Sequence, residues 1–400
     1  MKYFLDVTIR PGEHYIHVRG RIAGAAENLF YLNENFTMLG ASAEKCRFDR
    51  SRPHPEYDTV SRPLLFEPDH RDFEFEYEGF IPTIIDDVNQ IDEDAVELAC
   101  YAGWYPKPKR FGEFFEFEIR LSLPSGYEVM SNGAMKSGNT ILSVGPEDDI
   151  AIFASRKVCR CHYENDRVAV STLCPEDMLA DMESRAKDIA AANDFYTMKY
   201  GPLQRGKGKV EILSVFRPRG GWAYKRGNVS FLSADQSRGI RQYRMDFHEL
   251  AHGWWCIADM ESSDWINEGC AEFSAYSAAK HIYGKESAGK YLDKYLADID
   301  RCSGTASIAE TKSTSPDKYT NFYEKTVVML LNAQLLFGEN RIFDLLKELF
   351  QKFNETKGAA TKDFLALCGA EMRAYFEKCL YSSGWQGIDY KSRLQECRSF

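Results

Sequence analysis

A five-residue stretch near the middle of the chain has the residue types and spacing of a metal site. His248-Glu249-Leu250-Ala251-His252 places two histidines four positions apart and a glutamate after the first. On a helix, positions i and i+4 lie on one face, so both imidazoles can bind one metal ion while Glu249 acts on a metal-activated water. The alternative is a pair of core histidines satisfied by hydrogen bonds, but burying two histidines and a glutamate on one turn is costly without a shared partner.

A catalytic zinc site needs a third protein ligand and an open fourth position. The stretch Trp265-Ile266-Asn267-Glu268-Gly269 supplies a carboxylate sixteen positions after His252. That spacing lets a first helix end, a short loop turn back, and a second helix bring Glu268 to the metal. A glutamate near a helix N-terminus is also favoured by the helix dipole alone, by about 0.3–1 kcal/mol. We therefore expect one Zn²⁺ per chain on His248, His252 and Glu268, although such a ligand set accepts several divalent metals.

Two further carboxylates could support the metal ligands from behind. Glu272 follows Glu268 by four positions, on the same helix face, and could accept a hydrogen bond from a zinc-bound imidazole. The commoner role of such a glutamate is an exposed or salt-bridged surface position. Asp264 is a similar candidate, for which a helix N-cap or turn role is the alternative.

The elements that must position these residues differ between the two halves of the chain. Segments such as KYFLDVTI, FEFEYEGFI and EFFEFEIRLSL alternate apolar and polar residues, which predicts strands. Gly, Pro, Asn and Asp clusters separate them, and this favours an antiparallel sandwich. After Tyr243 nearly every segment has helical spacing. The sequence thus predicts an α+β protein, with an N-terminal antiparallel β-sandwich domain over residues 1–165 and a mainly helical domain over residues 166–400.

Composition limits the class of protein and its partners. Hydrophobic residues make up 44% and charged residues 28% of the 400 residues, the ordinary balance of a globular protein. A net charge of −10 disfavours nucleic-acid binding by bulk charge. No apolar run approaches the ~20 residues of a membrane span, and no secretory signal begins the chain. Eleven cysteines without such a signal suggest reduced thiols and a cytoplasmic protein. The oligomeric state stays open.

The two central motifs resemble those of a known family. H-E-L-A-H followed by W-I-N-E-G is similar to the H-E-x-x-H and W-L-N-E-G of gluzincin zinc metallopeptidases of the aminopeptidase N and leukotriene hydrolase type, whose usual gap is three residues longer. Tyr323-Glu324-Lys325 resembles the family's Y-E-K-G, with Thr326 in place of the glycine. Gly103-Trp104-Tyr105-Pro106 resembles its tryptophan–aromatic–proline turn. The resemblance implies a thermolysin-like catalytic fold for residues 166–400.

The same resemblance implies a zinc-dependent peptidase, aminopeptidase-like, with a peptide as substrate. In that function Glu249 takes a proton from the metal-activated water and later passes it to the leaving amine. Tyr323 donates its hydroxyl to the oxyanion, a role suited to a phenol because it is a neutral donor at pH 7. The alternative for Tyr323 is packing or capping at the start of its helix.

The family's exopeptidase motif, G-x-M-E-N, is only partly matched. Gly220 and Gly221 are present, and we expect them on a strand that aligns the substrate chain, but Ala223 or Tyr224 falls where the amine-binding glutamate would stand. Nearby Arg219, Lys225 and Arg226 could favour an acidic side chain or a carboxylate, or form a solvated edge. An endopeptidase, a dipeptidase or an amidase on the same zinc site therefore stays open. A non-catalytic, zinc-containing binding module is a further alternative.

Overall fold

The computed structural model describes the chain apart from residues 50, 53–59, 68–70, 82–87, 109–112, 137–138, 204–208, 235–239, 303, 305, 386–388, 392–393 and 395–400. The chain divides into two compact units. The first contains residues 1–165, 169–183 and 211–236, and the second contains residues 166–168, 184–210 and 237–400. The chain passes from the first unit to the second at the predicted position 165/166, but residues 169–183 and 211–236 beyond it also belong to the first unit. The division into domains 1–165 and 166–400 stays a prediction.

The largest sheet of the first unit has seven strands within the described residues. Residues of β1 alternate between buried and exposed, with Leu5, Val7 and Ile9 at most 2% exposed, as the period-two pattern predicts. β1 pairs antiparallel with β2 but parallel with β11. The sequence did not predict that parallel pair, because alternation identifies the buried face and not the strand direction. In spatial order the strands are β13 (Gly133–Met135), β14 (Thr140–Ser143), β11 (Glu116–Ser122), β1 (Lys2–Arg10), β2 (Tyr15–Ala23), β7 (Phe73–Phe80) and β4 (Thr37–Met38).

Two smaller sheets share a core with the seven-stranded one. Leu64 and Val96, one from each small sheet, lie with Tyr3 in a single apolar cluster, so the layers form the predicted sandwich. One sheet contains β10 (Lys107–Pro108), β3 (Leu29–Asn33), β6 (Ser61–Phe66) and β5 (Cys46–Phe48). The other contains β12 (Glu128–Ser131), β15 (Ile152–Ser155), β9 (Ala95–Leu98) and β8 (Gln90–Ile91). Short helical segments are η1 (Pro11–Glu13), α1 (Ser42–Lys45), η2 (Cys100–Ala102) and η4 (Glu176–Met178).

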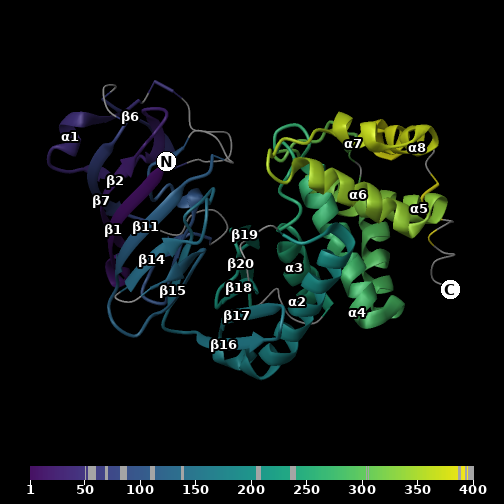
Figure 1. Ribbon diagram of the computed structural model, residues 1–400, viewed down its shortest axis with the longest axis horizontal. Helices are drawn as coiled ribbons and strands as arrows, with labels where there is room; N and C mark the ends of the chain where they lie inside the picture. Colours follow the sequence, from purple (N-terminus) through teal and green to yellow (C-terminus); the bar gives the residue numbers. More distant parts are fainter. Residues whose placement is uncertain are drawn as a thin grey trace. The chain divides into compact units, whose positions relative to one another are not determined.

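A further sheet, of five strands within the described residues, follows the sandwich in the sequence (Figure 1). Its order is β16 (Cys159–Glu164), β17 (Val168–Cys174), β18 (Val210–Arg217), β20 (Val229–Ser233) and β19 (Tyr224–Arg226). β20 pairs parallel with β18 and antiparallel with the edge strand β19. Gly220 and Gly221 lie in the connection before β19 and not in a strand, which corrects the expectation for them. Gly221 has a φ of 118°, a backbone conformation that favours glycine and is incompatible with a regular strand.

The second unit is helical, as the spacing after Tyr243 predicts (Figure 1). In α6, for example, Ile342, Phe343, Leu346 and Leu349 are all buried at helical intervals. The helices are α2 (Leu179–Tyr200, which starts in the first unit), α3 (Ile240–Ala251), α4 (Asp264–Arg301), η5 (Tyr319–Lys325), α5 (Thr326–Phe337), α6 (Glu339–Phe353), α7 (Thr361–Leu367), α8 (Ala370–Tyr381) and η6 (Ser383–Trp385). The α+β class, with strands first and helices after, is confirmed.

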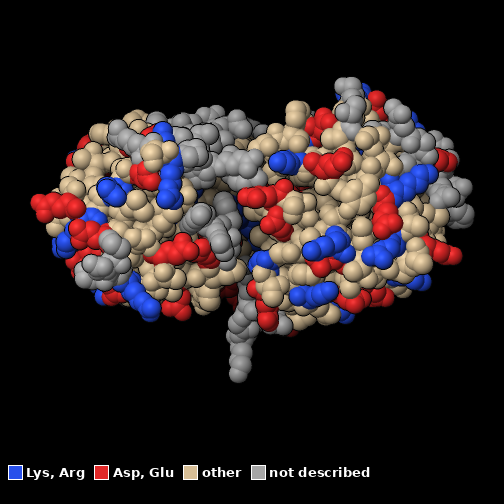
Figure 2. Space-filling view, turned by 90° about the horizontal axis from the view of Figure 1, so that it is seen from above, with Lys and Arg blue, Asp and Glu red and all other residues tan. Residues whose placement is uncertain are grey.

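The surface carries both signs of charge. Figure 2 shows Asp and Glu side chains interspersed with Lys and Arg over the visible face. Among the described helices, none combines the length and apolarity that crossing a bilayer requires.

Candidate metal centre

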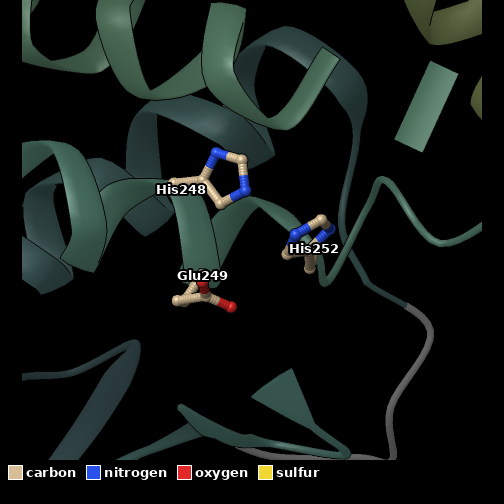
Figure 3. Close-up of side chains that lie close together, drawn as sticks. All are labelled: His248, Glu249 and His252. Atoms are coloured by element: carbon tan, nitrogen blue, oxygen red, sulfur yellow. The ribbon is translucent and has the colours of Figure 1, made fainter. Parts of the chain in front are cut away.

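Helix α3 brings the first three predicted site residues together. His248, Glu249 and His252 each offer one ligand atom, and these atoms all lie within 4.8 Å of one another. Figure 3 shows the three side chains projecting from the end of α3. His252 follows the last residue of α3, and its backbone N–H still donates to the carbonyl of His248 at 3.2 Å. The helical turn therefore extends through both histidines, so their side chains lie on one face.

The N-terminal turn of α4 adds the predicted third carboxylate. Glu268 Oε2 lies 3.2 Å from Nε2 of His248 and 3.6 Å from Nε2 of His252. The approach depends on Asn267, whose Oδ1 accepts hydrogen bonds from the backbone N–H groups of Ile257 and Ala258, at 3.0 and 2.9 Å. These bonds attach the loop after α3 to the first turn of α4. The short link that the sequence predicts between the two motifs is thus held in place by a residue inside the second motif.

The Nδ1 atom of each imidazole lies within hydrogen-bonding distance of an acceptor oxygen. His248 Nδ1 lies 2.8 Å from Glu272 Oε2, and His252 Nδ1 lies 2.9 Å from the Trp255 carbonyl oxygen. A carbonyl or ionised carboxylate can only accept, so both Nδ1 atoms carry the proton. In the neutral imidazole the lone pair is then on Nε2, the atom that faces Glu268. This arrangement selects the tautomer that a metal ligand needs.

Electrostatics favour a cation among these groups. Burial lowers the pKa of His248, but its hydrogen bonds to Glu268 and Glu272 outweigh that effect and raise the pKa to about 10. Burial raises the pKa of Glu268, yet the neighbouring His252 and His248 hold it well below its ordinary value. The carboxylate is therefore ionised beside two imidazoles. Without a metal the positive charge that it attracts is a proton on His248, which a metal ion would displace.

The donor set fits zinc in type and spacing. Three donors each 2.0–2.1 Å from one tetrahedral ion lie roughly 3.3–3.4 Å apart. The 3.2 and 3.6 Å separations between Glu268 Oε2 and the two Nε2 atoms bracket that value. Two imidazoles and one carboxylate are a known ligand combination of catalytic zinc. His248, His252 and Glu268 are thus the residues that would hold the ion.

A buried ion pair anchors α3 to the preceding helix. Arg185 of α2 donates from Nε and Nη2 to both oxygens of Asp246, at 2.5 and 2.7 Å, and both side chains are nearly inaccessible to solvent. Tyr196 of the same helix donates its hydroxyl to the Phe247 carbonyl at 3.0 Å. These bonds hold Asp246 and Phe247, the two residues directly before His248, and so they position the turn that carries the metal ligands.

Tyr323 lies on a π-helical segment beside the cluster. Its ring stacks on His248, with centroids 5.4 Å apart. Burial and the carboxylate of Glu268 raise its pKa well above 10, so the phenol stays protonated and can donate. Gly269 permits this approach, because a Cβ there would lie 2.4 Å from Thr326 Cγ2 and 2.7 Å from the Phe322 carbonyl oxygen. Single π-helical turns occur frequently at functional sites.

The two supporting carboxylates take different roles. Glu272 is 1% exposed and contacts His248, as expected for a carboxylate behind a metal ligand; it also accepts from Arg244 and Tyr295. Asp264 is buried in the first turn of α4 and accepts from Ser313 Oγ and Asn267 Nδ2, at 2.7 and 3.0 Å. Burial and the charge of Glu268 raise the pKa of Asp264 to about 6. Its hydrogen bond from Asn267 attaches Asp264 to the turn that carries Glu268.

In the first unit, the residues around the partly matched exopeptidase motif are engaged with each other. Tyr224 donates its hydroxyl to Glu97 Oε1 at 2.7 Å, and Arg217 donates to the same oxygen at 3.1 Å. Arg219 forms an ion pair with an aspartate, and Arg226 Nε lies 2.8 Å from Asp149 Oδ2. Arg226 is therefore paired and mostly buried within this unit, whereas Arg219 is paired but has a 42% exposed side chain, as the solvated-edge alternative expects.

Three residues of the centre had no role in the sequence interpretation. Asn267 lies inside the W-I-N-E-G stretch, and an asparagine near the start of a helix could have been predicted to bond to backbone groups there. Arg244 precedes His248 by four positions and so shares its helix face, which was a second available signal. Tyr295 lies 23 positions after Glu272, and no spacing rule connects the two.

Comparison with known proteins identifies the fold. Neither models of protein families nor curated proteins gave a match. The crystal structure of an M1 zinc metallopeptidase from Deinococcus radiodurans matches with a TM-score of 0.70 and 14% identity, covering 95% of this chain and 93% of that one. A mutant of such an enzyme from the same organism, bound to a Tyr-Ser-Ala substrate, matches with the same values. A two-domain M1 zinc metallopeptidase mutant bound to L-tryptophan covers 96% and 94%, again at 0.70 and 14%. The chain has the fold of these M1 zinc metallopeptidases.

Proposed function

We propose that the chain is a zinc-dependent, aminopeptidase-like peptidase that holds one Zn²⁺ on His248, His252 and Glu268. The observation that carries the proposal is the convergence of Glu268 Oε2 on both Nε2 atoms, 3.2 and 3.6 Å away, while both Nδ1 atoms face acceptors. The fold supports it, since the M1 zinc metallopeptidases that match have bound a peptide or an amino acid. A peptide is accordingly the proposed substrate.

The chemistry divides between the metal and two side chains. When bound, zinc supplies Lewis-acid polarisation of the scissile carbonyl and makes a water more acidic. Glu249, 5% exposed and in the same cluster, removes a proton from the attacking water and delivers it to the leaving nitrogen as the C–N bond breaks. Tyr323 donates its hydroxyl to the oxyanion that develops on the carbonyl oxygen. The products are a carboxylate and a free amine.

The substitution Glu249→Gln tests this assignment. Because Glu249 acts on the water and is not one of the three ligands, the variant keeps about one zinc per chain while peptide hydrolysis falls by about 10²–10⁴-fold. Zinc content by elemental analysis and turnover of aminoacyl anilides are the two measurements. Glu355→Gln, an exposed substitution of the same kind in the helical unit, serves as the matched control with unchanged turnover. Full turnover by Glu249→Gln, or wild-type protein without stoichiometric metal, contradicts the proposal.

An endopeptidase, dipeptidase or amidase on the same zinc is the second candidate. It is favoured by Tyr224, which stands in the region where related enzymes place an amine-binding glutamate and donates to Glu97. Comparing free and N-acetylated peptides of the same sequence separates the two candidates. An aminopeptidase requires the free amine, whereas the second candidate cleaves both peptides. No turnover of either, with zinc bound, is the outcome expected of a non-catalytic binding module.

A further inference from the structure

Helix α4 is two helical arms joined at one residue. Gly284 has φ 83° and ψ 172°, a non-helical conformation accessible essentially only to glycine. In a straight helix, 23 residues would separate Glu272 and Tyr295 by about 35 Å. The Tyr295 hydroxyl instead donates directly to Glu272 Oε1. The second arm therefore folds back at Gly284 and returns a tyrosine to the metal centre.

The two oxygens of Glu272 have different partners. Oε2 accepts from His248 Nδ1 at 2.8 Å. Oε1 accepts from both Arg244 and Tyr295, and the Arg244 guanidinium also lies over the Tyr295 ring, 5.6 Å from its centroid. With donors on both oxygens, the carboxylate cannot rotate without breaking at least one of these bonds. Its orientation, and through it the orientation of the His248 ring, is set by Arg244 on α3 and by Tyr295 on the second arm of α4.

The charge of Arg244 matters because the carboxylate is buried. Glu272 and Tyr295 are each 1% exposed. An ionised carboxylate in such a place is stabilised only when it is paired and hydrogen-bonded. Arg244 supplies the compensating charge, and Tyr295 supplies a neutral donor that adds no charge next to a cation site. Glu272 can then remain an acceptor for His248 Nδ1 when His248 is neutral and acts as a ligand.

We propose that Arg244, Glu272 and Tyr295 form a positioning relay that orients His248 for the metal, so that closure of the α4 hairpin contributes to zinc affinity. The inference rests on the proposed zinc site. None of the three residues contacts the reacting atoms in this scheme. They act through His248, whose Nε2 they hold toward Glu268. Partners that orient a metal-binding histidine typically change metal affinity by about 10–100-fold when removed.

The test measures zinc affinity by competition with a chromogenic chelator on the full-length protein. Tyr295→Phe removes one donor and is expected to weaken zinc binding by about 2- to 10-fold, the equivalent of one hydrogen bond. Glu272→Gln is expected to weaken it by about 10–100-fold. Tyr283→Phe is the matched control. The Tyr283 hydroxyl, on the first arm of α4, also donates to a carboxylate, Oδ2 of Asp188 on α2, at 2.6 Å, and this bond involves neither His248 nor Glu272. Its zinc affinity is expected to stay at the wild-type value.

A denaturation midpoint for each variant separates positioning from general destabilisation. The relay predicts that Tyr295→Phe loses zinc affinity while Tyr283→Phe, even at a similar loss of stability, does not. Wild-type affinity in Tyr295→Phe, or equal losses in both tyrosine variants, overturns the relay. Should Glu272→Gln fail to fold, the two tyrosine variants still decide the question. A wild-type protein that binds no zinc refutes the proposed function instead, which is a different result.

Discussion

The substitution Gly269→Ala tests how the helix that carries Glu268 packs against the segment that carries Tyr323. A Cβ at position 269 would lie 2.4 Å from Thr326 Cγ2 and 2.7 Å from both Thr326 Cβ and the Phe322 carbonyl oxygen. Ordinary contact begins near 3.4 Å, so the end of η5 and the start of α5 must move away by roughly 1 Å. Overpacking of this kind costs about 1–3 kcal/mol. Alanine also gains about 1 kcal/mol of helix propensity over glycine, which masks part of the cost.

Gly289→Ala isolates the packing cost, because Gly289 lies on the second arm of α4 with nothing within 4 Å of its Cβ position. We expect Gly289→Ala to be more stable than the wild type by up to about 1 kcal/mol, and Gly269→Ala to be less stable than Gly289→Ala by about 1–3 kcal/mol. Urea denaturation at one pH measures both. A misplacement of about 1 Å at Tyr323 is expected to lower kcat by up to about 10²-fold while zinc stays bound.

A second substitution relieves part of the clash. Thr326→Ser removes the Cγ2 atom, which gives the shortest contact, and keeps the hydroxyl that donates to the Asn321 carbonyl at 3.0 Å. In the Gly269→Ala background it should recover part of the lost stability and kcat. The packing argument is refuted if Gly269→Ala is as stable as Gly289→Ala and retains wild-type kcat.

Two predictions concern buried charges next to the centre. Burial and the neighbouring Asp298 raise the pKa of Glu324 from 4.5 to about 7, so the native state favours the protonated acid. The unfolded state ionises at lower pH than the native state. The free energy of unfolding therefore falls as pH rises from about 4.5 through 7. Glu324→Gln should therefore raise the free energy of unfolding by about 1–2 kcal/mol at pH 8 and change it little at pH 4, measured by denaturation at both values. Arg185→Met leaves Asp246 buried without its cation and should lower that free energy by about 3–5 kcal/mol at pH 7, measured in the same way.

Controls for these two variants come from exposed residues of the same types. Glu348→Gln and Arg341→Met lie on the exposed side of α6 and should shift the free energy of unfolding by less than about 0.5 kcal/mol. A Glu324→Gln effect that is the same at pH 4 and pH 8 would mean that ionisation is not its cause. An Arg185→Met variant as stable as Arg341→Met would show that the buried pair does not hold α3 in place.

The sequence by itself determined the candidate metal ligands and the kind of element that carries them. The spacing of His248 and His252 is a property of the helix, because residues four apart share a face whatever surrounds them. Alternation in the N-terminal half predicted strands for the same reason, since it depends only on local backbone geometry. Glu268 could be named from its motif and its spacing after His252, and Glu272 because it shares one helix face with Glu268.

Only the tertiary structure decided how these pieces meet. The parallel pairing of β1 with β11 and the return of Tyr295 to Glu272 join residues far apart in sequence, and periodicity has no information on such contacts. Gly220 and Gly221 were expected on a strand, but the chain turns there before β19 begins. A local pattern determines the face that a residue occupies within its element. The element against which that face packs depends on contacts throughout the whole unit. Such contacts could not be predicted from residue spacing.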